Sequence, residues 1–149
     1  MKSDSKRGTA RGKGEESNVE VLAAAAFARL PELAEADEGL ARRGRHLTTE
    51  CLCEIGAVPF FASIAAGRLT ALERGPQLMR PWRFAVRASA PAWLAFWRPL
   101  PEPGWHDLFA LTKRGEARLE GDLYPLMANL QYFKDLLALP RRLSEGARR

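Results

Sequence analysis

Cysteine and histidine are scarce in this chain of 149 residues, which holds two of each. Cys51 and Cys53 are two positions apart, so on a strand both side chains lie on the same side, where a disulfide between them is poorly placed. Two thiols with two histidines also do not make a structural zinc site. We therefore expect two buried free thiols and neither a metal nor a cofactor. Free thiols, together with the lack of a signal peptide, indicate a reducing, cytoplasmic setting.

Long apolar runs and catalytic motifs are lacking as well. No apolar run approaches the roughly 20 residues that a membrane span needs, and the stretch Val21–Leu30 is too short. There is no Gly-rich phosphate loop, no nucleophile elbow and no metal-ligand spacing. His106 and Asp107 are neighbours, but adjacent residues on a helix diverge by about 100° and do not face each other. These absences weaken the case for an enzyme without excluding one.

The net charge of +5 comes from the two ends of the chain. Residues 1–19 hold five basic and three acidic side chains, residues 141–149 hold four and one, and the 14 basic and 14 acidic side chains between them balance. A nucleic-acid-binding fold concentrates Lys and Arg on its folded body, so we expect no nucleic-acid partner. Residues 1–17 and 144–149 are expected to be disordered tails around one domain at residues 18–143. Weak contact of these basic tails with a membrane surface stays open as the alternative.

The first half of the chain changes from a helical to a strand-like pattern. Apolar residues at helical spacing predict helices over Val19–Leu30 and Glu32–Arg43, with Pro31 ending or kinking the first. Alternation then predicts three short strands joined by glycine-bearing turns, which indicates an antiparallel meander. These strands are Thr48–Ile55, Val58–Ala65 and Arg68–Arg74.

The second half interleaves strands with helices. A fourth strand is predicted over Pro81–Ala88, and Ser89 is placed to cap a helix over Ala90–Trp97. A short helix follows around His106–Lys113, and then a short strand over Glu116–Gly121. Asp122 is expected to cap a last helix, which Pro140 stops. This order is α+β rather than a strict alternation of strand and helix.

Three segments carry a resemblance to a known family. The sequence WRFAVRASAPAWLAFW (82–97) resembles a strand that runs straight into a capped helix, and RGEARLEGDLYPLMANL (114–130) resembles a short strand, a Gly-Asp step and a leucine-rich helix. The earlier FFASIAAGRLTALERGP (60–76) resembles a strand–turn–strand with a glycine at the turn. In this order they resemble the sterol carrier protein type-two domain family, over about 90 residues. The chain departs from that pattern at a Pro-Glu-Pro-Gly-Trp insert (101–105) and lacks the peroxisomal C-terminal tripeptide.

The resemblance implies a small five-stranded sheet, an antiparallel meander plus crossover strands, covered by helices with an apolar tunnel between the layers. It also implies a lipid-like small molecule as the partner: a sterol, a fatty acid or an acyl-CoA ester, bound without chemistry. Twelve of the thirteen aromatic residues lie between Phe60 and Phe133, and such side chains either fill a core or line a cavity. The residues that we expect around the ligand are Phe60, Phe84, Trp93, Phe96, Trp97, Phe109, Leu126, Met127, Leu130, Phe133 and Leu137.

Two other functions stay open on the sequence. The same pocket could belong to an enzyme or a biosynthetic accessory protein that acts on a hydrophobic small molecule, which an acid or base inside the cavity would favour. A core filled by side chains would instead favour a protein–protein interaction module. The sequence gives no indication of the oligomeric state.

Overall fold

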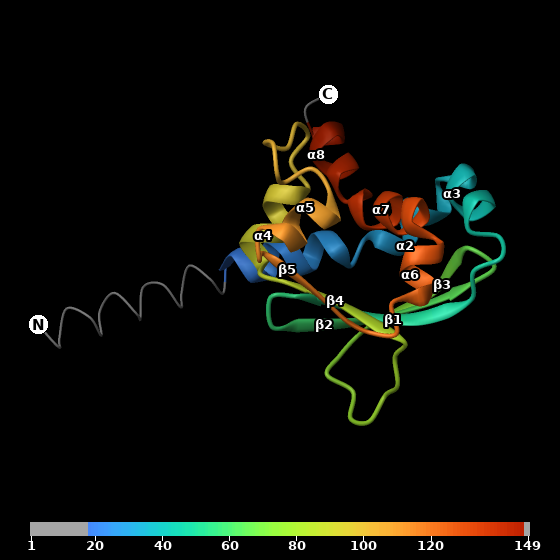
Figure 1. The fold of residues 1–149 in the computed structure, drawn as a ribbon. Coiled ribbons are helices and arrows are strands. Elements are labelled where there is room, and N and C mark those ends of the chain that lie inside the picture. The colour runs from blue at the N-terminus through green and yellow to red at the C-terminus, as the bar shows by residue number, and fades with distance from the viewer. Residues whose placement is uncertain (1–17, 148–149) are drawn as a thin grey trace, which may run out of the picture.

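The computed structural model describes residues 18–147 and consists of one sheet and one layer of helices (Figure 1). A first helix occupies residues 18–27. The elements that follow are α2 (Leu30–Glu35), α3 (Glu38–Arg43), β1 (Thr49–Ile55), β2 (Val58–Ala65), β3 (Arg68–Arg74), β4 (Phe84–Ala88), α4 (Ala90–Phe96), α5 (Leu108–Lys113), β5 (Ala117–Gly121), α6 (Tyr124–Ala128), α7 (Leu130–Ala138) and α8 (Arg141–Ala147). The tail expected at residues 1–17 lies outside the described residues, and α8 extends through most of the segment expected as the second tail.

The sheet has five strands in the order β3-β2-β1-β4-β5. Strands β1, β2 and β3 pair antiparallel, β4 pairs parallel to β1, and β5 pairs antiparallel to β4. The expected α+β architecture, a meander plus crossover strands, is confirmed. The helices lie on one face of the sheet, and the loop between β3 and β4 crosses the other face (Figure 1).

The two faces of the sheet are closed in different ways. On the helix-covered face, Cys51, Cys53 and Ile55 are buried, and both cysteines are free thiols as expected. On the opposite face a small apolar cluster of Leu52, Phe61 and Ala85 packs with Trp82 from the loop. Arginine side chains close this cluster from outside: the guanidinium of Arg80 lies 4.9 Å from the Phe61 ring centroid, and that of Arg87 lies 5.7 Å from the Trp82 ring.

Several helix boundaries differ from the prediction, because single polar side chains and prolines determine where a helix begins. The helix expected over Glu32–Arg43 is two helices, since Asp37 accepts a hydrogen bond from the Leu40 amide (3.0 Å) and starts α3. Pro31 lies in the first turn of α2 rather than at the end of a helix. Ser89 caps α4 as predicted, accepting from the Ala92 amide (3.2 Å).

The predicted last helix is broken into two pieces, and a further helix follows it. Asn129 leaves the helical conformation (φ −129°, ψ 42°), which separates α6 from α7; α7 ends before Pro140 as predicted, and α8 begins directly after this proline. Asp122 accepts from the Tyr124 amide at 3.0 Å, although Leu123 occupies the N-cap position. The layer of helices above the sheet is therefore made of short pieces.

In the turn between β2 and β3, the backbone of Gly67 packs directly against the backbone of Ala41 and Gly44. Gly67 has φ +80°, and its amide donates to the Leu47 carbonyl at 3.0 Å. A Cβ atom on Gly67 would lie 2.4 Å from the Ala41 carbonyl oxygen and 2.6 Å from the Gly44 carbonyl carbon. Since these neighbours are backbone atoms, no side chain can turn away to make room.

We predict that Gly67→Ala lowers the free energy of unfolding by at least about 3 kcal/mol, because strain in φ adds to a backbone overlap. Gly115→Ala is the matched control: Gly115 has φ +77° but a Cβ there would meet nothing within 4 Å. The control should lose only about 1–2 kcal/mol, the cost of the left-handed conformation. Urea unfolding measures both, and equal losses would contradict the overlap at Gly67.

Candidate functional site

Five aromatic side chains fill one end of the space between the sheet and the helices. This interlayer cluster consists of Phe27, Phe60, Trp93, Phe96 and Trp97, none more than 3% exposed. The Phe27 ring centroid lies 5.1 Å from that of Phe60 and 6.1 Å from that of Trp97, on which it stacks. The Trp93 and Trp97 rings stack at 5.3 Å. Residues from the first helix, from β2 and from α4 therefore meet at one point.

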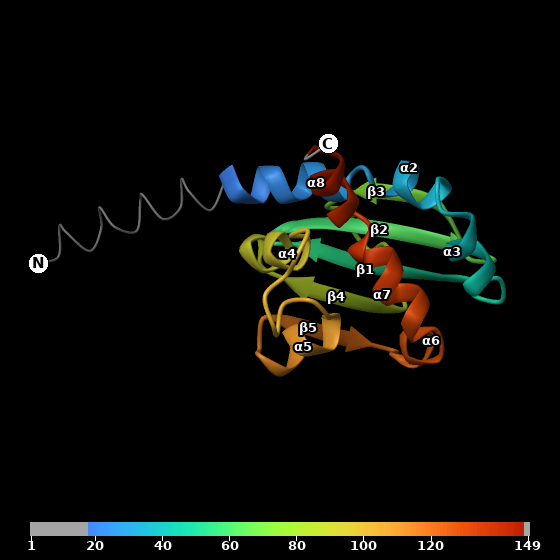
Figure 2. The same ribbon diagram turned by 90° about the horizontal axis from the view of Figure 1, so that it is seen from above.

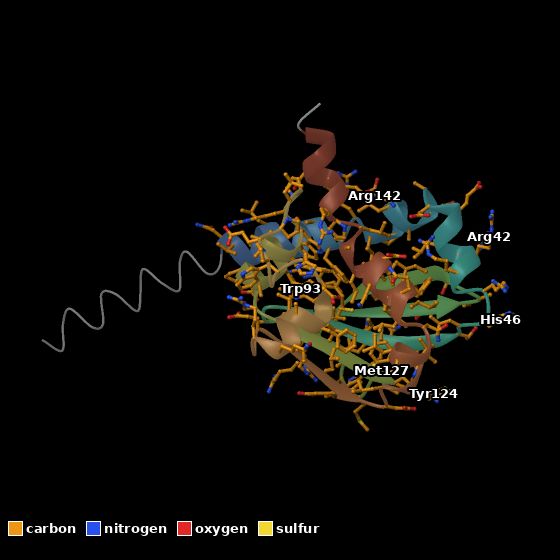
Figure 3. All side chains as sticks on the ribbon, turned by 45° about the horizontal axis from the view of Figure 1, so that its top comes forward. Arg42, His46, Trp93, Tyr124, Met127 and Arg142 are labelled. Atoms are coloured by element: carbon orange, nitrogen blue, oxygen red, sulfur yellow. The ribbon has the colours of Figure 1, made fainter. Side chains whose placement is uncertain are left out.

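Both indoles of the interlayer cluster are held by hydrogen bonds. Trp93 Nε1 donates to the Glu54 carbonyl of β1, and Trp97 Nε1 donates to the Leu137 carbonyl of α7, each at 2.8 Å. Figure 3 shows Trp93 inside the molecule. A buried indole N–H without a partner would be costly, so these bonds fix the orientation of both rings. Phe27, Phe60 and Phe96 carry no such group.

A second aromatic group lies beneath α7. The Phe133 ring centroid is 5.1 Å from that of Phe84 and 5.2 Å from that of Tyr132, with the rings close to perpendicular in both pairs. The Tyr132 hydroxyl donates to the Gly67 carbonyl at 2.8 Å, so α7 is bonded to the turn between β2 and β3. Burial, with a smaller contribution from Cys51, raises the pKa of Tyr132 to about 12.

Most of the residues expected around a ligand are brought together. Eight of them are buried in one apolar core: Phe60, Phe84, Trp93, Phe96, Trp97, Leu126, Phe133 and Leu137. Phe109 and Leu130 are half-buried, and the Lys134 ammonium lies 5.5 Å from the Phe109 ring centroid. Met127 is 54% exposed and lies at the surface, near Tyr124 (Figure 3).

Phe27 and Tyr132 were not expected in this site. Phe27 is the single aromatic residue before Phe60 in the sequence, in an alanine-rich helix, and this isolation is the one signal that could have singled it out. Tyr132 lies on the same helix as Phe133, but its hydroxyl gave no reason to place it in an apolar core. Its acceptor, Gly67, is 65 positions away in the chain.

Two hollows in the described part of the chain lie at the rim of the helical layer. One of about 480 Å³ lies between α3, α7 and α8, and ion pairs line it: Arg43 to Asp135 at 3.1 Å and Arg142 to Asp37 at 2.8 Å. Another of about 240 Å³ lies between α2, α3 and β3 and includes Leu69. The interlayer space itself is occupied by the aromatic side chains described above.

The interlayer space offers little acid–base chemistry. Among the described residues, Thr49 is the buried polar side chain besides Tyr132 and the two cysteines, and its hydroxyl has no hydrogen-bond partner. A hydrogen bond with Cys51, together with burial, raises the pKa of the Cys53 thiol well above its usual value. His46 and His106 are exposed. Within residues 18–147, no three His, Cys, Asp or Glu side chains gather as metal ligands.

The fold is similar to that of solved proteins. A crystal structure of sterol carrier protein 2 superimposes with a TM-score of 0.62 over 78% of this chain and 94% of that chain, at 13% sequence identity. The chain has the sterol carrier protein 2 fold. A conserved hypothetical protein of Thermus thermophilus, described as a candidate sterol carrier protein, gives a TM-score of 0.56 at 14% identity, with 80% and 85% of the two chains covered.

A third protein with this fold is named for a biosynthetic role. UbiJ-SCP2, a ubiquinone synthesis protein, gives a TM-score of 0.52 at 17% identity, over 82% of this chain and 93% of that one. No protein-family profile matches the sequence, and no curated protein matches it either. In the described part of the chain, none of the helices is both long and apolar enough to cross a membrane.

We predict that Tyr132→Phe lowers the free energy of unfolding by about 1–3 kcal/mol at neutral pH, because the buried Gly67 carbonyl loses its donor. The raised pKa of Tyr132 also makes the free energy of unfolding of the wild type depend on pH. The unfolded state releases the tyrosine proton near pH 10 and the folded state near pH 12, so the stability that the neutral phenol contributes is lost as pH rises through this window.

Urea unfolding at neutral pH and within this window measures both effects. As pH rises through this window, the free energy of unfolding of Tyr132→Phe should fall less steeply than that of the wild type. Tyr124→Phe, at a residue that is 75% exposed, is the control and should behave as the wild type does. Parallel pH curves for all three proteins would refute the role assigned to the Tyr132 hydroxyl.

Proposed function

We propose that this chain binds an apolar molecule, such as a sterol, a fatty acid or the acyl part of an acyl-CoA ester, between the sheet and the helices and carries it without chemistry. The observation that carries the proposal is the likeness to sterol carrier protein 2. The composition of the interlayer space supports it, because an aromatic layer that holds no charged side chain among the described residues suits an apolar ligand and offers no general acid or base.

Binding requires that some side chains of the interlayer cluster give way, and Phe27 is the ring that we expect to move. Trp93 and Trp97 are each tethered by a hydrogen bond to a backbone carbonyl, whereas Phe27 has no polar atom in its side chain. Besides Phe27, the helix that carries it fully buries only two small side chains, Ala23 and Ala24, while Val19 and Ala26 are half-buried against the core. We infer that an apolar chain takes the place of the Phe27 ring.

The ligand would then meet the neighbours that Phe27 leaves, namely Phe60, Trp93 and Trp97. Phe96 and Leu137 belong to the same core, and the remaining buried candidates, Phe84, Leu126 and Phe133, lie further along it under α6 and α7. Each square ångström of apolar ligand surface removed from water contributes roughly 25 cal/mol, against the cost of displacing the ring. Phe109, Leu130 and the exposed Met127 could touch only a longer ligand.

A role as a biosynthetic accessory protein is the second candidate. The likeness to a ubiquinone synthesis protein favours it, since presenting a hydrophobic intermediate to an enzyme needs the same apolar site. The two roles differ in the molecule that stays bound. A purified carrier is expected to hold membrane lipids, whereas an accessory protein is expected to hold one class of polyprenylated or aromatic intermediate.

Native mass spectrometry of the purified protein, before and after delipidation, tests both candidates by the mass of the molecule released. Binding of a fluorescent fatty acid to the delipidated protein follows. If the protein carries nothing and does not bind the fatty acid at micromolar concentration, the interlayer space is a filled core and both candidates fail.

We predict that Phe27→Ala binds the fluorescent fatty acid about tenfold more tightly than the wild type or better, because the ligand no longer displaces the ring. The same change should lower the free energy of unfolding by about 3–5 kcal/mol. Phe61→Ala is the matched control: it removes an equally large buried ring, but from the cluster on the opposite face of the sheet. The control should lose stability without gaining affinity. Equal affinities of the two variants would place the ligand elsewhere.

A further inference from the structure

One end of the sheet gathers exposed arginines and exposed apolar side chains. Strand β1 begins and β5 ends at this end, because β4 between them runs parallel to β1 and antiparallel to β5. Two strand spacings, about 10 Å, separate these points. The turn before β1, the turn between β2 and β3, and α6 therefore all lie at this end of the sheet (Figure 2). We call this surface the α6 rim; it consists of Arg42, Arg45, His46, Arg68, Tyr124 and Met127.

The arginines of the α6 rim lack carboxylate partners. Arg42, Arg45 and Arg68 are exposed, and no Asp or Glu of the described residues lies within ion-pair distance of them. The segment 41–48 holds three arginines and one histidine but no acid. Three acids near this surface are paired with other arginines: Asp135 with Arg43, Asp37 with Arg142 and Asp122 with Arg83. Two further acids form no ion pair within the described part of the chain: Glu35, which lines the same hollow as Arg68, and Glu38, one helical turn before Arg42 on α3.

Helix α6 presents apolar side chains in two directions. Its five residues, Tyr124–Ala128, include no charged side chain. Pro125 and Leu126 are buried against the core, while Tyr124 is 75% and Met127 is 54% exposed. Tyr124 and Met127 are three residues apart and so lie on the same side of α6, where together they form a small exposed apolar patch. Figure 3 shows Tyr124 and Met127 at the same end of the molecule as Arg42 and His46.

We propose that the α6 rim docks this protein on an anionic membrane surface. Arginines without acidic partners are attracted to anionic headgroups, and tyrosine and methionine can enter the boundary between headgroups and acyl chains. A nucleic acid would use the arginines but gives Met127 no role. The proposal extends the proposed function, since a carrier has to meet a membrane, but it rests on separate residues.

The two most exposed of the large apolar side chains lack this pairing with charge. Leu78 and Met79, 94% and 91% exposed, project at the tip of the loop between β3 and β4. The arginines that follow in that loop are already paired, Arg80 with Glu73 at 2.8 Å and Arg83 with Asp122 at 3.0 Å. The loop therefore lacks the charge complementarity that singles out the α6 rim.

Sedimentation of the full chain with phosphatidylcholine vesicles, with and without phosphatidylserine, tests the proposal. The wild type should bind the phosphatidylserine vesicles, and less so as salt rises. Each rim arginine is expected to contribute roughly a factor of five to this affinity, so Arg42→Gln with Arg45→Gln should weaken it roughly 25-fold. Tyr124→Ser with Met127→Ser should weaken it about fivefold or more. All of these positions are exposed, so the variants should fold.

The charge-matched control is Arg98→Gln with Lys113→Gln, which removes the same charge from exposed positions at the opposite end of the sheet. This control should bind as the wild type does. Equal weakening by both charge variants would assign binding to overall charge, the basic tails included, and would overturn the proposal. So would a wild type that does not sediment, or vesicle binding that depends on the arginines alone and is displaced by RNA.

Fatty-acid binding without vesicles separates this proposal from the proposed function. The rim variants should keep the wild-type affinity for the fluorescent fatty acid. A protein that binds the fatty acid but no vesicle refutes the docking surface alone, and one that binds vesicles but no fatty acid refutes the carrier role alone.

Discussion

The contact of the Gly67 backbone with its neighbours sets the position of the helical layer. Gly67 lies against the backbone of Ala41 and Gly44, and its carbonyl accepts from the Tyr132 hydroxyl, so the turn between β2 and β3 holds both α3 and α7. Gly44 in turn lies against the Tyr132 ring, where a Cβ would come within 2.6 Å of two ring carbons. Two glycines and one tyrosine thus fix how close the helices come to the sheet at this end, and the volume left between the layers follows from that distance.

At the other end of the helical layer, Trp93 and Trp97 hold the helices at a fixed distance from the sheet. Trp97 bonds to α7 and Trp93 to β1, so α4 is tied both to the helix above the cluster and to the sheet below it. The rings without polar atoms pack between these fixed points. The proposed ligand binding depends on this division: the hydrogen bonds of the two indoles hold α4, α7 and β1 in place, while a ring without a polar atom is free of such a bond.

The sequence predicts the sheet better than the helices. Strands β2 and β3 begin and end as expected because glycine-bearing turns bound them. The helices break at Asp37 and Asn129, where one side-chain hydrogen bond or one non-helical residue outweighs a continuing apolar stripe. The core positions of Trp93 and Phe133 are predictable from spacing. The place of Phe27 is not, since it depends on a helix crossing strands that come much later in the chain.

The outer face of the sheet has no helical layer, and arginines take its place. Arg87 bridges Glu54 of β1 and Glu120 of β5 while lying over Trp82, and Arg80 covers Phe61. Neighbouring strands are thus linked by charges on the water side, and guanidinium groups lie over two of the aromatic rings there, Phe61 and Trp82. The strands therefore present a largely charged surface on this side, which lowers the tendency of the sheet to associate face to face with another copy of the chain.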